Sequence, residues 1–184
     1  MMTLRFFPMS HHGLLMMSFV LLFSLWKSVL ADAGHMPIGG PAAYDVVARS
    51  VVVKLYDHFF EPEAIIVKPR ETVRFVIENL GQSVHEFMIG TPKMHTMHQQ
   101  ELLAIVKQGL ISEHHIDHDK MAGHLHGERS LHSRRHYDLS SVLLEPGEIK
   151  TLVWQFPHSS DIQFACNMPG HFEAGMLGEF FFDD

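Results

Sequence analysis

Apolar and polar residues alternate in two parts of the chain, before residue 90 and after residue 141. Between residues 72 and 79, Val73, Phe75 and Ile77 share one face, which is the two-residue period of a half-buried β-strand. Similar alternation, or a run of β-branched residues, predicts further strands over 44–56, 64–67, 84–89, 142–144, 149–156, 162–166 and 176–182. Short strands with frequent turns and no βαβ rhythm are typical of an antiparallel sandwich or barrel, so the sequence predicts an all-β fold.

The pattern changes between residues 91 and 137. Thr91 followed by Pro92 is a favourable helix start, and Gly109 is a favourable stop. After Gly109 the chain is rich in histidine and has few apolar residues and no sustained period, so we expect a loop with at most a short helix. We interpret residues 91–137 as a helical and loop insertion in a single domain that spans residues 44–184.

The first 33 residues have the organisation of a secretory signal. Arg5 supplies a positive charge, residues 14–26 form an apolar run, and residues 31–33 offer a small-residue cleavage site after Ala31 or Ala33. An uncleaved membrane anchor is the alternative, but the apolar run is short for a bilayer span. The sequence therefore predicts export to the periplasm, with no stable membrane insertion after signal cleavage. Residues 34–43, rich in glycine and proline, are expected to form a flexible leader.

The composition shows a negative net charge and an excess of residue types that bind metals. Hydrophobic residues make up 46% of the 184-residue chain, enough for a packed core, and the net charge of -7 argues against a nucleic-acid partner. Histidine occurs 16 times, methionine 12 times and cysteine once. The single cysteine excludes an intramolecular disulfide, and in an oxidising compartment a lone thiol is protected when it is buried or bound to metal.

That cysteine lies in the sequence FACNMPGHFEAGM, which holds Cys166, His171 and Met176. Strand alternation turns Cys166 inward at the end of one predicted strand and turns His85 inward on another. Two histidines, one cysteine and a weak methionine ligand make up a type 1 copper site, which holds copper as Cu(I) or Cu(II). Each residue alone is better explained as core or loop packing. Their joint spacing within a β pattern favours a copper site made of His85, Cys166, His171 and Met176.

With these residues the chain resembles the cupredoxins, the small blue copper proteins that include plastocyanin, azurin and rusticyanin. The resemblance covers roughly residues 46–89 and 142–182, and it is nearest to bacterial periplasmic proteins of this family that carry His/Met-rich additions and are associated with copper tolerance. It implies a Greek-key β-sandwich with copper near one end and electron transfer through the edge of His171. Many cupredoxins have Asn or Ser directly after the first histidine, whereas this chain has Glu86, which we expect to alter the potential or colour of the site.

The insertion carries nine histidines, more than a solvated polar loop easily explains. We predict a second, weaker metal-binding region there, with its candidate ligands among His114, His115, His118, Met121, His124 and His126. His95 and His98 fall near the apolar stripe of the predicted helix and are expected to pack there instead.

Three classes of function fit these observations. The first is a copper protein for electron transfer, copper tolerance or both, which acts as a monomer with an unknown redox partner protein and performs no substrate chemistry. The second is a copper buffer that works mainly through the insertion. The third, a copper oxidase or nitrite reductase, needs a further copper centre, and the oxidases flank their type 1 cysteine with histidines where this chain has Ala165 and Asn167.

Overall fold

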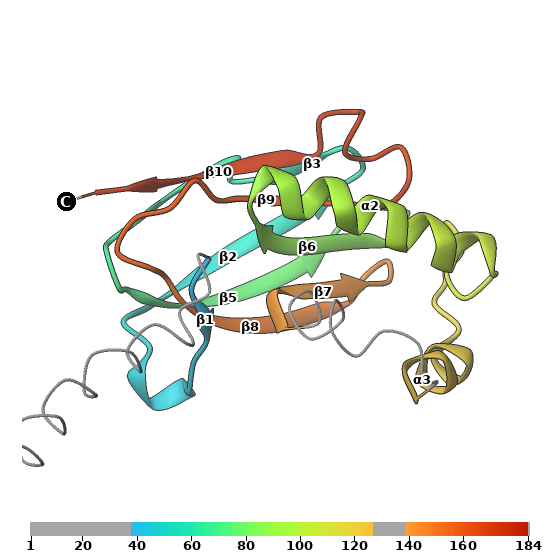
Figure 1. Cartoon of the computed structure of the whole chain (residues 1–184), viewed down its shortest axis with the longest axis horizontal. Coiled ribbons are helices and arrows are strands. Elements are labelled where there is room, and N and C mark those ends of the chain that lie inside the picture. The colour runs from blue at the N-terminus through green and yellow to red at the C-terminus, as the bar shows by residue number, and fades with distance from the viewer. Residues whose placement is uncertain (1–37, 127–138, 184) are drawn as a thin grey trace, which may run out of the picture. The chain divides into compact units, whose positions relative to one another are not determined.

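The computed structural model of the chain describes residues 38–126 and 139–183 (Figure 1). The predicted signal segment, residues 1–33, lies outside the described residues. So do residues 34–37 of the predicted leader and residues 127–138 of the predicted insertion.

The described strands form two five-stranded sheets, and eight of these ten strands overlap the ranges that the sequence predicts. In sheet order, the first sheet consists of β1 (Gly40–Pro41), β8 (Ile149–Gln155), β5 (Thr72–Asn79), β2 (Arg49–Tyr56) and β3 (Phe59–Glu61). The second sheet consists of β4 (Ala64–Val67), β10 (Leu177–Phe182), β9 (Gln163–Ala165), β6 (His85–Gly90) and β7 (Ser141–Leu144). The all-β prediction is therefore confirmed.

The sheets are mixed, however, because two strand pairs are parallel where the predicted sandwich or barrel is antiparallel. Strand β2 pairs parallel to β5, with Arg49 opposite Val73, and β4 pairs parallel to β10, with Ala64 opposite Glu179. The chain leaves the first sheet through β4 and returns to it with β5, so β2 and β5 run in the same direction. Alternation identifies which face of a strand is buried, but it does not identify the neighbouring strand. The start of the first predicted strand is also different, because Tyr44–Val46 forms a short 3-10 helix, η1.

The side chains between the sheets form an aromatic-rich core. Val73, Phe75 and Ile77 are fully buried, as their shared face predicts. Phe164 of β9 lies edge-on to Phe60 of β3, with ring centroids 5.1 Å apart. Burying a side chain of this size stabilises the fold by about 1.5–3 kcal/mol. The core therefore anchors β9 two residues before Cys166.

Helix α2 (Pro92–Lys107) covers the outer face of β6 (Figure 1). It begins as predicted, since the Thr91 hydroxyl accepts a hydrogen bond from the backbone N–H of Met94 at 3.3 Å, and it ends shortly before Gly109. Because the core covers one face of β6 and α2 the other, all six residues of β6 are buried. A second short helix, α3 (His118–His126), lies in the histidine-rich part of the insertion. Within the described residues, neither α2 nor α3 has the length and apolar character that a membrane-spanning helix needs.

Candidate metal centre

Three of the four predicted ligands bring their donor atoms together at one end of the second sheet. The Nδ1 atoms of His85 and His171 are 3.1 Å apart, and the Cys166 sulfur lies 3.8 Å from the first and 3.4 Å from the second. Among the described residues, this is the one group of three or more His, Cys, Asp or Glu side chains close enough to share a metal ion. The centre of such a triangle lies about 2 Å from each atom, the length of a metal–imidazole bond, so the donor set fits a metal ion.

The positions of these donors follow from the sheet. His85 is the first residue of β6, Cys166 directly follows β9, and these two strands are neighbours. The loop after Cys166 is held at both ends, because the Cys166 N–H donates to the carbonyl of Met176 at 3.1 Å and the Met176 N–H donates to that of His171 at 3.0 Å. Gly175 has φ +95°, a conformation that favours glycine, and it allows the chain to turn back at this point. The fourth residue, Met176, is fully buried beside Cys166, and its role as a ligand stays a prediction.

The Cys166 thiol is fully buried. Burial raises the pKa of Cys166 to about 12, and the backbone N–H of Glu86 donates to its sulfur at 3.3 Å. Without metal the thiol is therefore protonated at neutral pH, whereas a coordinated thiol is deprotonated. Metal binding at this site would release that proton.

The Asp57 carboxylate orients the His85 ring through Nε2, the ring nitrogen that does not face the other donors. The Asp57 Oδ1 atom lies 3.0 Å from His85 Nε2, and this carboxylate also accepts the backbone N–H groups of Gln82 and Ser83. Although burial opposes it, these hydrogen bonds hold the pKa of Asp57 below its usual value, and burial likewise lowers the pKa of His85. A neutral His85 that donates from Nε2 keeps the lone pair of Nδ1 for a metal. Asp57 was not predicted, since an aspartate in a turn 28 residues before the histidine gives no signal of this contact.

Gly81 has no side chain, which leaves space for the contact between Asp57 and His85. A Cβ atom at residue 81 would lie 2.5 Å from Asp57 Oδ1 and 2.7 Å from His85 Nε2. Real Cβ atoms do not approach so closely. The turn after β5 therefore has a specific requirement for glycine at this position.

His171 lies at the surface end of the site. Its side chain is half-buried, and its ring stacks with that of His58 at a centroid distance of 6.0 Å. Burial, followed by the nearby rings of His85 and His58, lowers the pKa of His171. Both histidines of the donor triangle are therefore neutral, and available to a metal, at neutral pH.

Glu86 lies on the face of β6 opposite His85, as strand alternation predicts. It does not reach solvent, however, because α2 covers that face and leaves Glu86 only 1% exposed. His95 and His98 of α2 are also buried, as expected from their place near the apolar stripe.

The predicted second metal region is described only in part. His114 Nδ1 lies 2.8 Å from the carbonyl of Gln82, and His115 Nδ1 lies 2.8 Å from Glu145 Oε1. His118, Met121, His124 and His126 lie on α3. The described side chains of this region do not form a group of three donors. A metal site in the insertion stays a prediction.

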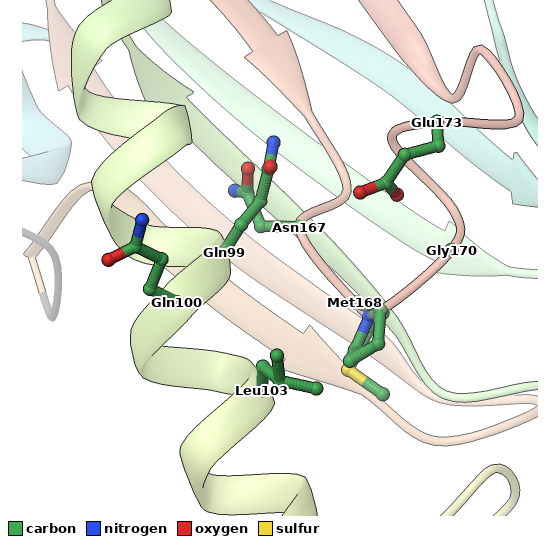
Figure 2. A pocket seen from close by; sticks show the side chains of 8 residues that line it. Gln99, Gln100, Leu103, Asn167, Met168, Gly170 and Glu173 are labelled. Atoms are coloured by element: carbon green, nitrogen blue, oxygen red, sulfur yellow. The ribbon is translucent and has the colours of Figure 1, made fainter.

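A hollow of about 220 Å³ separates α2 from the metal-site loop (Figure 2). On the α2 side it is lined by Gln99, Gln100 and Leu103, and on the loop side by Asn167, Met168 and Glu173 among others. Asn167 directly follows Cys166, so the wall of this hollow includes the sequence neighbour of a proposed ligand.

The chain is similar in sequence to known copper-resistance proteins. The chain is 40% identical over 156 residues to the copper-resistant cuproprotein CopI of Pseudomonas aeruginosa, and the match covers 83% of this chain and 86% of the relative. It is 32% identical over 165 residues to the protein of the same name from Rubrivivax gelatinosus, with 81% and 84% covered. No protein-family model matches the chain.

Among solved structures, auracyanin B has a similar fold. The TM-score is 0.58 at 16% sequence identity, and the match covers 79% of this chain and 96% of auracyanin B. This likeness shows a cupredoxin-like fold, as the sequence resemblance implies.

Proposed function

The chain belongs to the CopI family of copper-resistant cuproproteins, and we propose that it serves copper tolerance by holding one redox-active copper ion on His85, Cys166, His171 and Met176. The observation that carries this proposal is the triangle of donor atoms, with sides of 3.1, 3.4 and 3.8 Å. Thiolate and thioether donors suit Cu(I), whereas imidazole suits both oxidation states. Copper bound there would cycle between Cu(I) and Cu(II) and so carry one electron.

Electron transfer is the reaction that we assign to the site. Two of the donor residues, His85 and Cys166, are fully buried, whereas His171 is half-buried and offers an edge to a redox partner protein. A site fixed by the sheets, with donors for both oxidation states, favours electron transfer over substrate chemistry. We therefore propose that the protein is not an enzyme and acts as a monomer.

We further propose that the protein works in the periplasm. Residues 1–33 have the charged start, apolar run and small-residue cleavage site of an exported protein. A single buried cysteine is compatible with an oxidising compartment. Export would place the copper site where excess copper enters the cell envelope.

The spectrum of the copper-loaded protein tests the ligand set. We expect an intense visible band from thiolate-to-copper charge transfer, which disappears in Cys166→Ser because serine provides no thiolate. Met176→Leu should shift this band, while Met168→Leu, a buried methionine of the same loop, should leave it unchanged. A colourless copper complex of the wild-type protein, or a band that survives Cys166→Ser, would contradict the proposal.

The physiological role is tested by growth of a strain that lacks the gene. Copper tolerance predicts that growth fails at copper concentrations that the parent strain survives, and that Cys166→Ser does not restore it. Equal growth of both strains in excess copper, with a respiratory defect instead, would favour electron transfer as the main role.

A further inference from the structure

A buried carboxylate lies directly behind the metal site and joins it to α2. Glu86 follows the ligand His85, and its side chain is 1% exposed. Its Oε2 atom accepts the backbone N–H of Asn167 at 3.3 Å and the side-chain amide of Asn167 at 2.8 Å. Its Oε1 atom accepts from the Ser141 hydroxyl and lies 2.8 Å from Nε2 of His98.

His98 comes from the second turn of α2 and is 9% exposed. Its Nε2 lies 2.8 Å from Glu86 and its Nδ1 lies 3.3 Å from Glu101 Oε2. Carboxylates only accept hydrogen bonds, so an imidazole between two of them donates from both nitrogens and is positively charged. His98 therefore balances the buried charge of Glu86, and its two ring nitrogens are not available to a metal.

The network ends on the residue next to the cysteine ligand. Besides its bonds to Glu86, Asn167 contacts His95 of α2, with Oδ1 and Nδ1 3.2 Å apart. The backbone N–H of Glu86 donates to the Cys166 sulfur. Residue 86 thus holds the start of the metal-site loop through its backbone and its side chain, and α2 holds the same point from the other side.

We propose that Glu86 and His98 form a buried positioning pair through which the α2 insertion fixes the Cys166 loop and tunes the copper site. This inference rests on the proposed function for its copper readout. It gives the helical insertion a role that does not require metal binding by its histidines. The pair acts through Asn167 and the Cys166 sulfur, and neither Glu86 nor His98 is a ligand.

The first test measures amide hydrogen exchange in the metal-free protein. Glu86→Gln retains the side-chain volume but replaces one carboxylate oxygen with an NH₂ group that accepts no hydrogen bond. His98→Gln removes the charge that balances Glu86. In both variants we expect the Asn167 amide to exchange at least about tenfold faster, since the bond at a buried acceptor is weakened or lost. The matched control is His158→Gln, which changes an exposed histidine in the connection between β8 and β9.

The second test measures the copper site itself. In Glu86→Gln and His98→Gln we expect a shifted visible band and a copper affinity lowered about 10- to 100-fold, the range for residues that orient ligands. His158→Gln should retain the wild-type band and affinity. A role of the pair in stability alone predicts lower melting temperatures with an unchanged band and affinity, and that result would overturn the inference.

A third variant tests the inference if Glu86→Gln does not fold. Asn167→Ser removes the amide link while leaving the Glu86–His98 pair intact. It should speed exchange of the Cys166 amide, and unchanged exchange would overturn the inference. A wild-type protein without the visible band would overturn the proposed function, whereas unchanged exchange in the folded Glu86 and His98 variants would overturn only the positioning role.

Discussion

Asp57 binds no metal in the proposed site, yet it determines which nitrogen of His85 is available to one. Its carboxylate accepts from Nε2 at 3.0 Å, which leaves Nδ1 directed at His171 and Cys166. Carboxylates in this position fix the tautomer and orientation of a metal-bound histidine and raise its basicity. Asp57 is therefore part of the site although it comes from the turn between β2 and β3.

We predict that Asp57→Asn weakens copper binding about 10- to 100-fold, the usual cost of losing a residue that orients a ligand. The amide keeps an oxygen that can accept from His85, but it removes the negative charge that favours the more oxidised copper. Competition with a chelator of known affinity measures the loss, and the visible band should persist because Cys166 is unaltered.

Asp183→Asn is the matched control, since it removes a carboxylate beyond the far end of β10, about 20 Å along the strand from Met176. A reduced copper affinity in this control would point to the net charge of the protein and not to the contact with His85. Equal affinities of Asp57→Asn and the wild-type protein would show that the contact does not orient the ligand.

The proposed ligands could be found from residue spacing, whereas Asp57 could not, and this contrast shows what spacing in a sequence can predict. Cys166 and His171 share one loop, and strand alternation turns His85 toward the same interior, so the meeting of these three donors could be predicted from the sequence. The role of Met176 as a ligand stays a prediction. Asp57 and Gly81 reach His85 only because the turns after β2 and β5 meet at one end of the sandwich. That meeting depends on the pairing of the strands, which alternation does not specify.

The contact between β6 and α2 also could not be predicted from the sequence pattern, although both elements could. Alternation correctly placed Glu86 opposite His85, and capping residues correctly placed the start of α2. Neither pattern indicates that the helix folds back over the outer face of the strand. The Glu86 carboxylate, which points away from the core between the sheets, is therefore buried under α2, and two histidines of the insertion become part of its surroundings.

The burial of Glu86 and His98 predicts how the stability of the protein depends on pH. Although burial alone would lower it, Glu86, followed by Glu101, raises the pKa of His98 from 6.5 to about 9. The folded state therefore binds the proton more tightly than the unfolded state. This stabilisation is complete below pH 6.5 and is lost as the pH rises through about 9.

For the metal-free protein we predict that the free energy of unfolding falls between pH 6.5 and 9 by on the order of 3 kcal/mol. Denaturant titrations at several pH values measure this slope, which should flatten in His98→Gln and persist in His158→Gln. Ionisation of Cys166 adds little to this slope below about pH 8, because burial raises its pKa from 9.0 to about 12 on folding. The same slope in His98→Gln would assign the dependence to another group.

The complete protein combines a cupredoxin-like frame with an insertion that has two distinct parts. Helix α2 packs on the frame and reaches the metal-site loop through His98 and Asn167. The histidine-rich part that follows contacts the frame through its backbone, since the carbonyl of Glu113 accepts the N–H of Val84 at 2.6 Å. The contacts of α2 therefore support a positioning role for this helix, while a second metal site in the histidine-rich part stays a prediction.

The number of copper ions per chain tests whether the insertion holds a second metal, since the proposed electron-transfer site needs only one. We predict two or more per wild-type chain, falling by at least one when His118, His124 and His126 are all replaced by Gln, with the visible band unchanged. Substitution is a cleaner test than deletion, because removing Glu113 would take away the backbone partner of Val84, next to the ligand His85. Elemental analysis of copper and sulfur in the purified protein gives the count. One copper per chain in both proteins would exclude the second site, and the histidines of the insertion would then act only through α2.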